Sequence, residues 1–472
     1  MRKKFEEHKI LWLLLFAFLL KEIFYLFVIP VWQGPDEQGH FDYVEKILHE
    51  RRIPNLKECY FSKKIYKSLA VLDFFEINQG GIVHESSKEA LDAISSESME
   101  SAEEDNWIVQ HPPFYYLLLS PFYLVSSPLG FFGQVYFLRF LSVLMGVGTL
   151  FLAYKIAQLL APKNIFFSLG VPIFIAFLPQ LSFMTTVIDN DNLVSFLSAI
   201  LFFIMTKNFT TPVSLSRSLM VGILLGLGSL TKYTFLPMLV IVFIYEILRL
   251  FVVKPNLKDW LISGLVQVAI IFTICGWWYL RNYKLYGKIF AAYDSIRVGG
   301  HDVRGDLTLK EFLLDMGFFR VYFERFWSVH TWRILVPRKL TYIGAIILTI
   351  TAFVGWLVLF LRRRVRGISQ YKIVLLSFLL VALLIHFSFV AGKLFQVAQK
   401  RGWLGATHSR YMFTVLIPIA VYYVEGLSAL VPKRLWRFAI IGLFVIAFAH
   451  DIWIYLFKVI PWFYTTGWFL IP

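Results

Sequence analysis

The feature that most constrains this chain is a succession of apolar blocks along almost its whole length. Each block holds roughly 15–23 residues, the length that an α-helix needs to cross a hydrocarbon core about 30 Å thick. Of the 472 residues, 58% are hydrophobic and only 16% are charged, whereas soluble domains carry about 25% charged residues. The sequence therefore predicts an all-α polytopic membrane protein, folded as one integral membrane domain over residues 1–472, and it excludes a soluble globular protein.

Eleven blocks have the length and composition of transmembrane helices, and about eleven spans are expected. The blocks at 191–206 and 216–231 are near the lower limit of length. The block at 10–31 is interpreted as a retained signal-anchor helix, because it is too long for a secretory signal and lacks a small-residue cleavage site. Within it, Lys21 and Glu22 are expected to face the bundle interior and to pair with other helices. The remaining blocks are 135–158, 165–184, 234–252, 260–280, 339–361, 372–391, 409–430 and 436–458.

The basic residues determine the expected orientation. A net charge of +15 could suggest nucleic acid, but Lys and Arg lie between the apolar blocks, which is the orientation signal of membrane proteins. One further apolar stretch, 113–127, decides the arrangement. If it does not cross, the basic connections all fall on the cytoplasmic side. We therefore expect 113–127 to be juxtamembrane or re-entrant, in a multi-pass protein of the plasma (inner) membrane with no nucleic-acid partner.

This topology places the long hydrophilic segments 32–112 and 282–336 on the extracytoplasmic side. Residues 36–50 have the apolar spacing of an amphipathic helix lying on the membrane surface. Residues 85–106 are rich in Ser and acidic residues, and are expected to form a mobile flap. Long connections of this kind are usually functional or disordered.

The candidate catalytic residues follow the first apolar block directly. Asp36 and Glu37 begin the predicted surface helix, at the membrane boundary, and His40 lies one turn further on. One interpretation is that Asp36 is only a helix cap, since acidic residues favour the positive end of a helix dipole. The other is that Asp36 is a general base, oriented by Glu37 and His40.

Other polar residues are predicted to reach the same external face. Arg139 lies a few residues inside a spanning block, where a charge needs a partner such as Asp36, Asp189 or a phosphate. Lys232 lies in a tight turn between two helices, where membrane anchoring and donor binding are both possible roles. The other residues expected there as substrate-binding candidates are His111, Asp189, Asp191, Arg281, Arg410 and Tyr411.

Several of these motifs, in this order, resemble the GT-C glycosyltransferases, above all the protein O-mannosyltransferase-like and aminoarabinose-transferase-like membrane enzymes. They are Pro35-Asp36-Glu37 with His40-Phe41, the stretch from His111 to Tyr116, the Asp189–Asn192 pairs, Arg281-Asn282 and Ser409-Arg410-Tyr411. The resemblance spans residues 1–290, with looser similarity to 430. One difference is that 282–336 is too short for the large extra domain of the mannosyltransferases, which makes a lipid or glycan acceptor more plausible than a folded protein.

The resemblance implies an inverting transferase that takes a sugar from a polyprenyl-phosphate-linked donor, with Asp36 as catalytic residue and Glu37 beside it. Asp36 would take the proton of the acceptor hydroxyl, which attacks the anomeric carbon opposite the phosphate. A leaving phosphate needs no second carboxylate as acid, so the glycosidase pattern does not apply. Basic groups would stabilise the charge on the phosphate. The candidates are Arg281, Arg325, Arg333, Lys393 and Arg410, although such residues also reach toward lipid headgroups without any catalytic role.

Three alternatives remain open from the residues. A divalent metal could bind Asp189 and Asp191 together with Asp36 and His40, but no dedicated ligand spacing is present, and binding of sugar or acceptor hydroxyls is the preferred role for Asp189. No other cofactor is expected. A transporter or flippase of a lipid-linked sugar would need repeats and charges near the membrane midplane. The sequence has no repeat, and its charged residues gather at one face of the membrane rather than at the centre. A related ligase of whole glycans usually lacks an acidic pair at this position.

Overall fold

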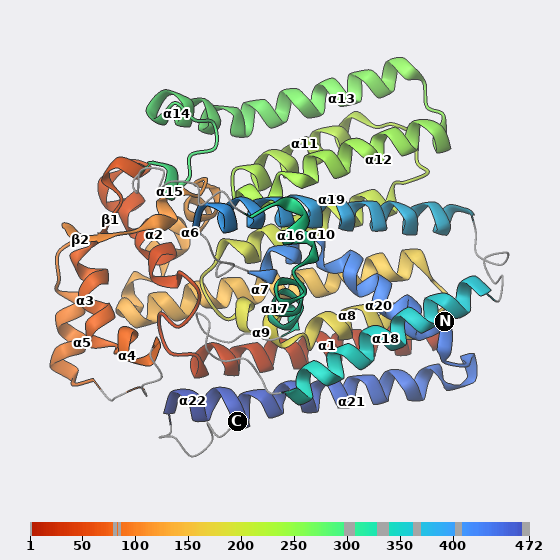
Figure 1. Cartoon of the computed structure of the whole chain (residues 1–472), viewed down its shortest axis with the longest axis horizontal. Helices are drawn as coiled ribbons and strands as arrows, with labels where there is room; N and C mark the ends of the chain where they lie inside the picture. The colour runs from red at the N-terminus through yellow and green to blue at the C-terminus, as the bar shows by residue number, and fades with distance from the viewer. Residues whose placement is uncertain are drawn as a thin grey trace.

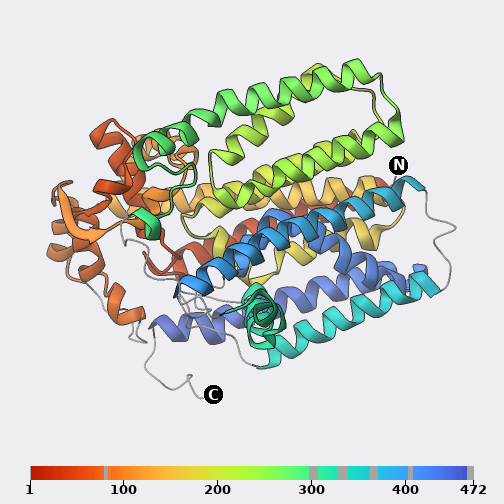
Figure 2. The ribbon, with the colours of Figure 1, turned by 45° about the horizontal axis from the view of Figure 1, so that its top comes forward.

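The computed structural model describes residues 2–78, 83, 86–296, 307–327, 339–361, 370–401 and 408–464. Long helices run roughly side by side as one bundle, and shorter elements gather at one end of it (Figures 1 and 2). The chain begins at the opposite end of the bundle, so α1 leads from there to the short elements (Figure 1). The bundle helices are α1 (Arg2–Val28), α7 (Gly130–Leu160), α8 (Ile165–Ala176), α9 (Pro179–Thr185), α10 (Asn190–Lys207), α11 (Leu215–Ser229), α12 (Pro237–Val253), α13 (Leu257–Ile271), α18 (Lys339–Leu361), α19 (Gln370–Arg401), α20 (Leu416–Leu430) and α21 (Trp436–Ile454).

The short elements form a cap over the end of the bundle. The helix α2 (Glu37–Glu50) packs on α6 (Phe114–Val125). The chain between these two helices contains the strands β1 (Tyr60–Ser62) and β2 (Ser101–Asp105), which pair in antiparallel orientation. Of the segment 85–106, expected as a mobile flap, the described residues 86–106 contain α5 and β2. Glu97 and Glu100 are ion-paired with Lys67 and Lys63. The other cap elements are α3 (Lys63–Val71), α4 (Phe74–Asn78), α5 (Lys88–Ser95), α14 (Trp277–Tyr286) and α15 (Tyr293–Ile296).

Within the described residues, eight helices are long and apolar enough to cross a membrane, or nine if the bent pair α8 and α9 is one span. All eleven predicted blocks are helical, so the difference from the expected eleven lies in α10 and α11. The 15 residues of α11 are too few, and α10 begins with the polar residues Asn190-Asp191-Asn192. Because α10 is buried among its neighbours, it does not need a long lipid-facing apolar surface. The stretch 113–127 contains the 12-residue helix α6, which is too short to span.

A buried charge cluster holds α1 against the bent pair α8–α9. The Lys21 ammonium donates to the Ala176 carbonyl at 2.7 Å and to Asp451 Oδ2 at 2.7 Å, and lies 3.1 Å from Glu22 Oε1. Thr185 of α9 donates to the other oxygen of Glu22. Ala176 is the last residue of α8, so Lys21 satisfies a carbonyl that the 61° bend leaves without an intrahelical partner. The expectation that Lys21 and Glu22 pair inside the bundle is confirmed.

Replacement of Lys21 by Met is expected to destabilise the protein by about 3–5 kcal/mol, because Glu22 and Asp451 then stay buried without their cation. Thermal unfolding in detergent micelles measures the loss. The Lys258→Met variant serves as control, since the exposed Lys258 begins α13 and its loss should change stability by about 0.5 kcal/mol or less. Equal melting temperatures for the two variants would contradict the structural role of Lys21.

Candidate active site

Asp36 lies where the chain leaves α1 and enters α2. The residue is the N-cap of α2, with φ 59° and ψ 15°, and its side chain makes no capping hydrogen bond. This left-handed conformation is unusual outside glycine, although Asp and Asn tolerate it better than most residues. Asp36 is therefore not explained as an ordinary helix cap, and the local strain fits a functional position.

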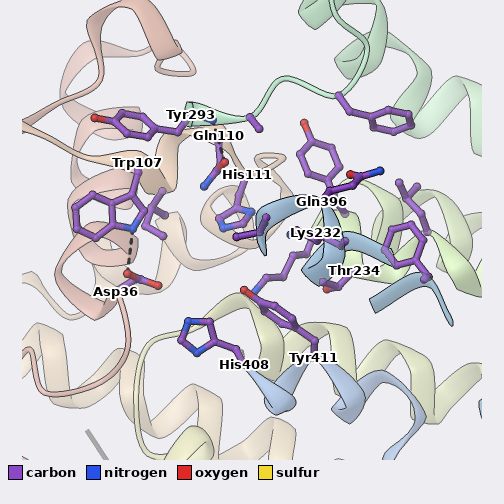
Figure 3. Close-up of a pocket in the computed structure, with 18 of the residues that line it drawn as sticks. Asp36, Trp107, Gln110, His111, Lys232, Thr234, Tyr293, Gln396, His408 and Tyr411 are labelled. Atoms are coloured by element: carbon purple, nitrogen blue, oxygen red, sulfur yellow. Dashed lines mark hydrogen bonds between the residues drawn. The ribbon is translucent and has the colours of Figure 1, made fainter. Parts of the chain in front are cut away.

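Two groups hold the Asp36 carboxylate. The indole of Trp107 donates to Oδ1 at 3.0 Å (Figure 3). Arg410 Nη2 lies 3.6 Å from Oδ2. Burial raises the pKa of Asp36 above its ordinary value, against the attraction of Arg410 and with support from the charge of Asp189. A carboxylate with a raised pKa is a better proton acceptor than an exposed one.

Glu37, next to Asp36, has a different environment. Arg139 binds both of its oxygens, with Nε to Oε1 at 2.8 Å and Nη2 to Oε2 at 2.7 Å, and neither side chain is exposed to solvent. The backbone amides of Trp32 and Ile188 donate to the same carboxylate. The remaining donors of Arg139 bind the carbonyls of Leu26, Ile29 and Pro30 at the end of α1.

The pair Glu37–Arg139 therefore has no free polar atom for a substrate, and neither residue lines the cavity described below. This geometry disagrees with the expectations of a catalytic Glu37 and a substrate-binding Arg139. The buried Arg139 does have a partner, as expected, but the partner is not Asp36, Asp189 or a phosphate. The partner is instead the neighbouring carboxylate, because Glu37 points into the bundle and Asp36 points away from it.

A second cluster joins α10, the α11–α12 turn and the 3-10 helix η7 (Ser409–Val415). Lys232 Nζ lies 2.7 Å from Asp191 Oδ1 and 3.7 Å from Asp189 Oδ1. Arg410 connects this cluster to Asp36, since its Nε lies 3.2 Å from Asp191 Oδ2. Burial alone would lower the pKa of Lys232, but the attraction of Asp191 and Asp189 outweighs it, so the pKa is raised and the ammonium stays charged.

Two histidines lie between the clusters. His40 Nδ1 is 3.0 Å from the Tyr116 hydroxyl, and His40 Nε2 is 3.9 Å from Asp189 Oδ2. His111 stacks on His40 with ring centroids 6.2 Å apart. Burial, together with the charge of Lys232, lowers the pKa of both imidazoles well below the usual value. Both rings are therefore neutral near pH 7.

These groups surround a cavity of about 1030 Å³ at the cap end of the bundle. Figure 3 shows Asp36 and Trp107 on one side of it and Lys232 and Tyr411 on the other. The predicted residues that line it are Asp36, His40, His111, Lys232, Arg410 and Tyr411, with Lys393 from the candidate cations. Asp189 and Asp191 lie behind Lys232 and Arg410.

Two other predicted arginines, Arg281 and Arg325, do not line the cavity. Arg281 donates to the carbonyls of Ile53 and Pro54 and lies over the Trp278 ring, so it anchors the segment after α2. Arg325 is in the last turn of α17 (Met316–Trp327) and does not line the cavity. Arg333 lies outside the described residues.

Several cavity residues were not among the predicted site residues, although Gln110 directly precedes the predicted His111. Trp107, Gln110 and Tyr293 line the side near Asp36, and the Tyr293 amide donates to Gln110 Oε1 at 3.1 Å. Gln396 comes from α19. Its distance of three residues from Lys393 could have indicated a shared helix face, but no sequence signal marks Trp107 or Tyr293.

No group of three or more His, Cys, Asp or Glu side chains that could hold a metal occurs in the described part of the chain. Asp189 and Asp191, the proposed metal ligands, are paired with Lys232 and Arg410 instead. These carboxylates therefore already have cationic partners.

No family model and no curated protein matches the sequence. Solved structures do resemble this fold. ArnT from Cupriavidus metallidurans bound to undecaprenyl phosphate is 12% identical, with a TM-score of 0.50 over 95% of this chain and 73% of ArnT. The archaeal oligosaccharyltransferase AglB from Archaeoglobus fulgidus, in complex with an inhibitory peptide and a dolichol-phosphate, is 14% identical, with a TM-score of 0.51. That match covers 98% of this chain and 55% of AglB, so the chain spans little more than half of the larger protein.

Both neighbours are GT-C proteins, and the chain has the fold of the GT-C membrane glycosyltransferases. The predicted fold resemblance is confirmed. At these levels of identity the comparison establishes the fold, and the chemistry has to be argued from the cavity.

Proposed function

We propose that this protein is an inverting glycosyltransferase that moves a sugar from a polyprenyl-phosphate-linked donor to a hydroxyl group. The observation that carries the proposal is one cavity with a raised-pKa carboxylate, Asp36, on one side and the cations Lys232, Lys393 and Arg410 on the other. The ArnT and AglB structures with bound polyprenyl or dolichol phosphates support this class of donor.

In the proposed reaction, the acceptor oxygen attacks the anomeric carbon while Asp36 takes the hydroxyl proton. The bond from the anomeric carbon to the phosphate oxygen breaks, and its electron pair stays on the phosphate. Because attack and departure occur on opposite faces, the anomeric configuration inverts. Lys232 and Arg410 are held in place by Asp189 and Asp191, so they need little reorganisation to stabilise the leaving phosphate.

The proposed site of reaction is the extracytoplasmic side of the membrane. The chain start and the connection between α12 and α13 lie at the end of the bundle opposite the cap (Figure 1). Lys254 follows α12 at this connection, and Lys258 is in the first turn of α13. Basic connections favour the cytoplasmic side, which supports an extracytoplasmic cap. We further propose a lipid or glycan acceptor, since the described cap elements are short and contain no large binding domain.

Purified protein in lipid nanodiscs tests the function. Polyprenyl-phosphate-linked sugars are supplied with lipid and glycan alcohols, and release of polyprenyl phosphate and the anomeric configuration of the product are followed by NMR. Transfer with inversion supports the proposal. Movement of intact donor across a proteoliposome membrane without transfer would favour a flippase, and a product with retained configuration would contradict the single displacement.

We expect kcat to fall at acidic pH with an apparent pKa above the ordinary range of an aspartate. Protonation removes the ability of Asp36 to accept a proton, and burial raises the pKa at which this occurs. His40 and His111 should add no inflection near pH 6–7, because burial keeps them neutral there. The pH profile of kcat measures this. If the fall of kcat at acidic pH disappears in the His40→Gln variant but remains in the Asp36→Glu variant, the titrating group is His40 and not Asp36.

A further inference from the structure

The indole that donates to Asp36 belongs to a very short element. Trp107 begins the 3-10 helix η2 (Trp107–Gln110), which has four residues, and it lies 71 residues after Asp36 in the chain. Figure 3 shows the two side chains meeting at one side of the cavity. A helix of this length makes too few internal hydrogen bonds to fix a side chain by itself. The position of the indole relative to Asp36 must therefore be fixed by contacts outside η2.

Asn106 provides these contacts. Its side chain is completely buried and uses both of its polar atoms. Oδ1 accepts from the Ile108 amide at 3.0 Å and so caps η2. Nδ2 donates to the Gly39 carbonyl at 3.0 Å and to Asp42 Oδ2 at 2.9 Å, both in α2. One amide therefore joins η2 to the first two turns of α2, the helix that begins directly after Asp36.

Asp42 extends this connection to the strands of the cap. It is completely buried, and its Oδ1 accepts from the amide of Ser62, where β1 ends, at 3.0 Å. The ammonium of Lys46, one turn further along α2, lies 3.5 Å from Oδ2. The carboxylate therefore has a cation and two N–H donors, which is what a buried charge requires.

Gly39 allows η2 to lie close to α2. A Cβ on Gly39 would lie 2.7 Å from Asn106 Oδ1 and 2.7 Å from Ile108 Cγ1, closer than real Cβ contacts. Glycine is unfavourable within a helix, and here it leaves the space that the Asn106 side chain occupies. Gly39, Asp42 and Asn106 do not line the cavity, so they can act on a substrate only through their neighbours.

We propose that Asn106 is a positioning residue for the base: by joining η2 to Gly39 and Asp42 of α2, it holds the Trp107 indole against the Asp36 carboxylate. This rests on the proposed function, in which Asp36 takes the proton of the acceptor hydroxyl. The indole occupies Oδ1 and fixes the rotation of the carboxylate. Oδ2 is then the oxygen that receives the proton.

Two substitutions of Asn106 separate the connection from the cap. In Asn106→Ser, the hydroxyl can still accept from the Ile108 amide, but it is too short to reach Gly39 or Asp42, whereas Asn106→Ala removes both functions. We expect both variants to lower kcat by roughly 10- to 100-fold with little change in KM, since a misplaced reacting group weakens the transition state more than substrate binding. If Asn106 only capped η2, Asn106→Ser would keep wild-type kcat.

Asn55 is the matched control. It caps the 3-10 helix η1 (Leu56–Glu58) by accepting from the Lys57 amide at 2.9 Å, and it does not line the cavity. Asn55→Ser and Asn55→Ala therefore make the same chemical changes away from Asp36, and kcat should stay at the wild-type level.

The indole N–H proton resonance of Trp107 reports the positioning without turnover. Trp107→Phe assigns it by its disappearance. In the wild type it should shift with pH as Asp36 takes up a proton, and Asp36→Asn should abolish this response. In Asn106→Ser we expect the resonance to move upfield, because the indole loses its acceptor, and its response to pH to shrink; Asn55→Ser should change neither. The charged groups that face Asp36 are the same in all these variants; they are Arg410, Asp189 and Lys232.

Gly39→Ala disturbs the same packing from the other side, in case the Asn106 variants do not fold. The added Cβ collides with Asn106 and Ile108, whereas Ala favours the helix α2 itself. It should reproduce the upfield shift of the Trp107 resonance and the loss of kcat, in a protein whose thermal unfolding remains cooperative.

The outcomes separate the two proposals. Wild-type protein that transfers no sugar would contradict the proposed function, and the Trp107 resonance would still decide whether Asn106 holds the indole against Asp36. Loss of transfer in Asp36→Asn, together with wild-type kcat and a wild-type Trp107 resonance in folded Asn106→Ser, would contradict only the positioning role. If Asn106 acts through Trp107, the double variant Asn106→Ser, Trp107→Phe loses little more kcat than the worse single variant. Losses that multiply would overturn this route.

Discussion

Replacement of Asp36 by Asn is expected to lower kcat by about 10²–10⁴-fold, because the side chain can no longer accept a proton. Asn is nearly the same size and tolerates the left-handed backbone at this position, so the fold should be preserved. Sugar transfer measured at saturating donor, with thermal unfolding of the same sample, checks both statements.

Two comparisons make this result interpretable. Asp36→Glu keeps a carboxylate but moves it, and should retain more activity than Asp36→Asn. Trp107→Phe removes the donor to Asp36 Oδ1 without removing the base, and should cause a smaller loss. Turnover of a folded Asp36→Asn variant within a few-fold of wild type would exclude Asp36 as the base.

Replacement of Arg139 by Met is expected to destabilise the protein by about 3–5 kcal/mol. Glu37 would stay fully buried with only the backbone amides of Trp32 and Ile188 as partners. Thermal unfolding in detergent or nanodiscs measures the loss. Since Glu37 directly follows Asp36, the same change should also reduce kcat through misplacement of the base.

The double variant Glu37→Gln, Arg139→Met removes both charges and keeps an amide oxygen for one of the two backbone donors, which bind different oxygens of Glu37. It should recover much of the stability lost in Arg139→Met, because replacing both members of a buried pair costs less than removing one. It should also retain more activity than Asp36→Asn. Activity as low as that of Asp36→Asn in a stable double variant would restore a catalytic role for Glu37.

Much of the site could be predicted because its residues are local or lie at helix ends. Asp36 and His40 follow the first spanning helix, and Lys232 and Arg410 lie beside other helices at the same end of the bundle. The alternation of spans sends these ends to one side, so the topology alone brings them near one another. The resemblance to the GT-C proteins favoured Asp36, among these residues, as the expected base.

The number of membrane-spanning helices was harder to predict from the sequence than the site. Block length is a reliable guide only for helices that face lipid. The helix α10 is enclosed by other helices, and α8 and α9 bend by 61° at a break. Burial of this kind depends on neighbours far apart in the sequence, so hydropathy does not report it.

The sequence by itself determined a multi-span helical bundle and the gathering of Asp36 with His111, Asp191 and Arg410 at one end, because hydrophobic length and charge placement act locally along the chain. Only the tertiary structure decided which carboxylate faces the cavity and which cations are already paired. Asp36 and Glu37 are adjacent and chemically alike, yet Glu37 is bound by Arg139, 102 residues away. The difference arises from the backbone turn at Asp36, which points the two side chains in different directions, and from packing contacts that no local pattern encodes.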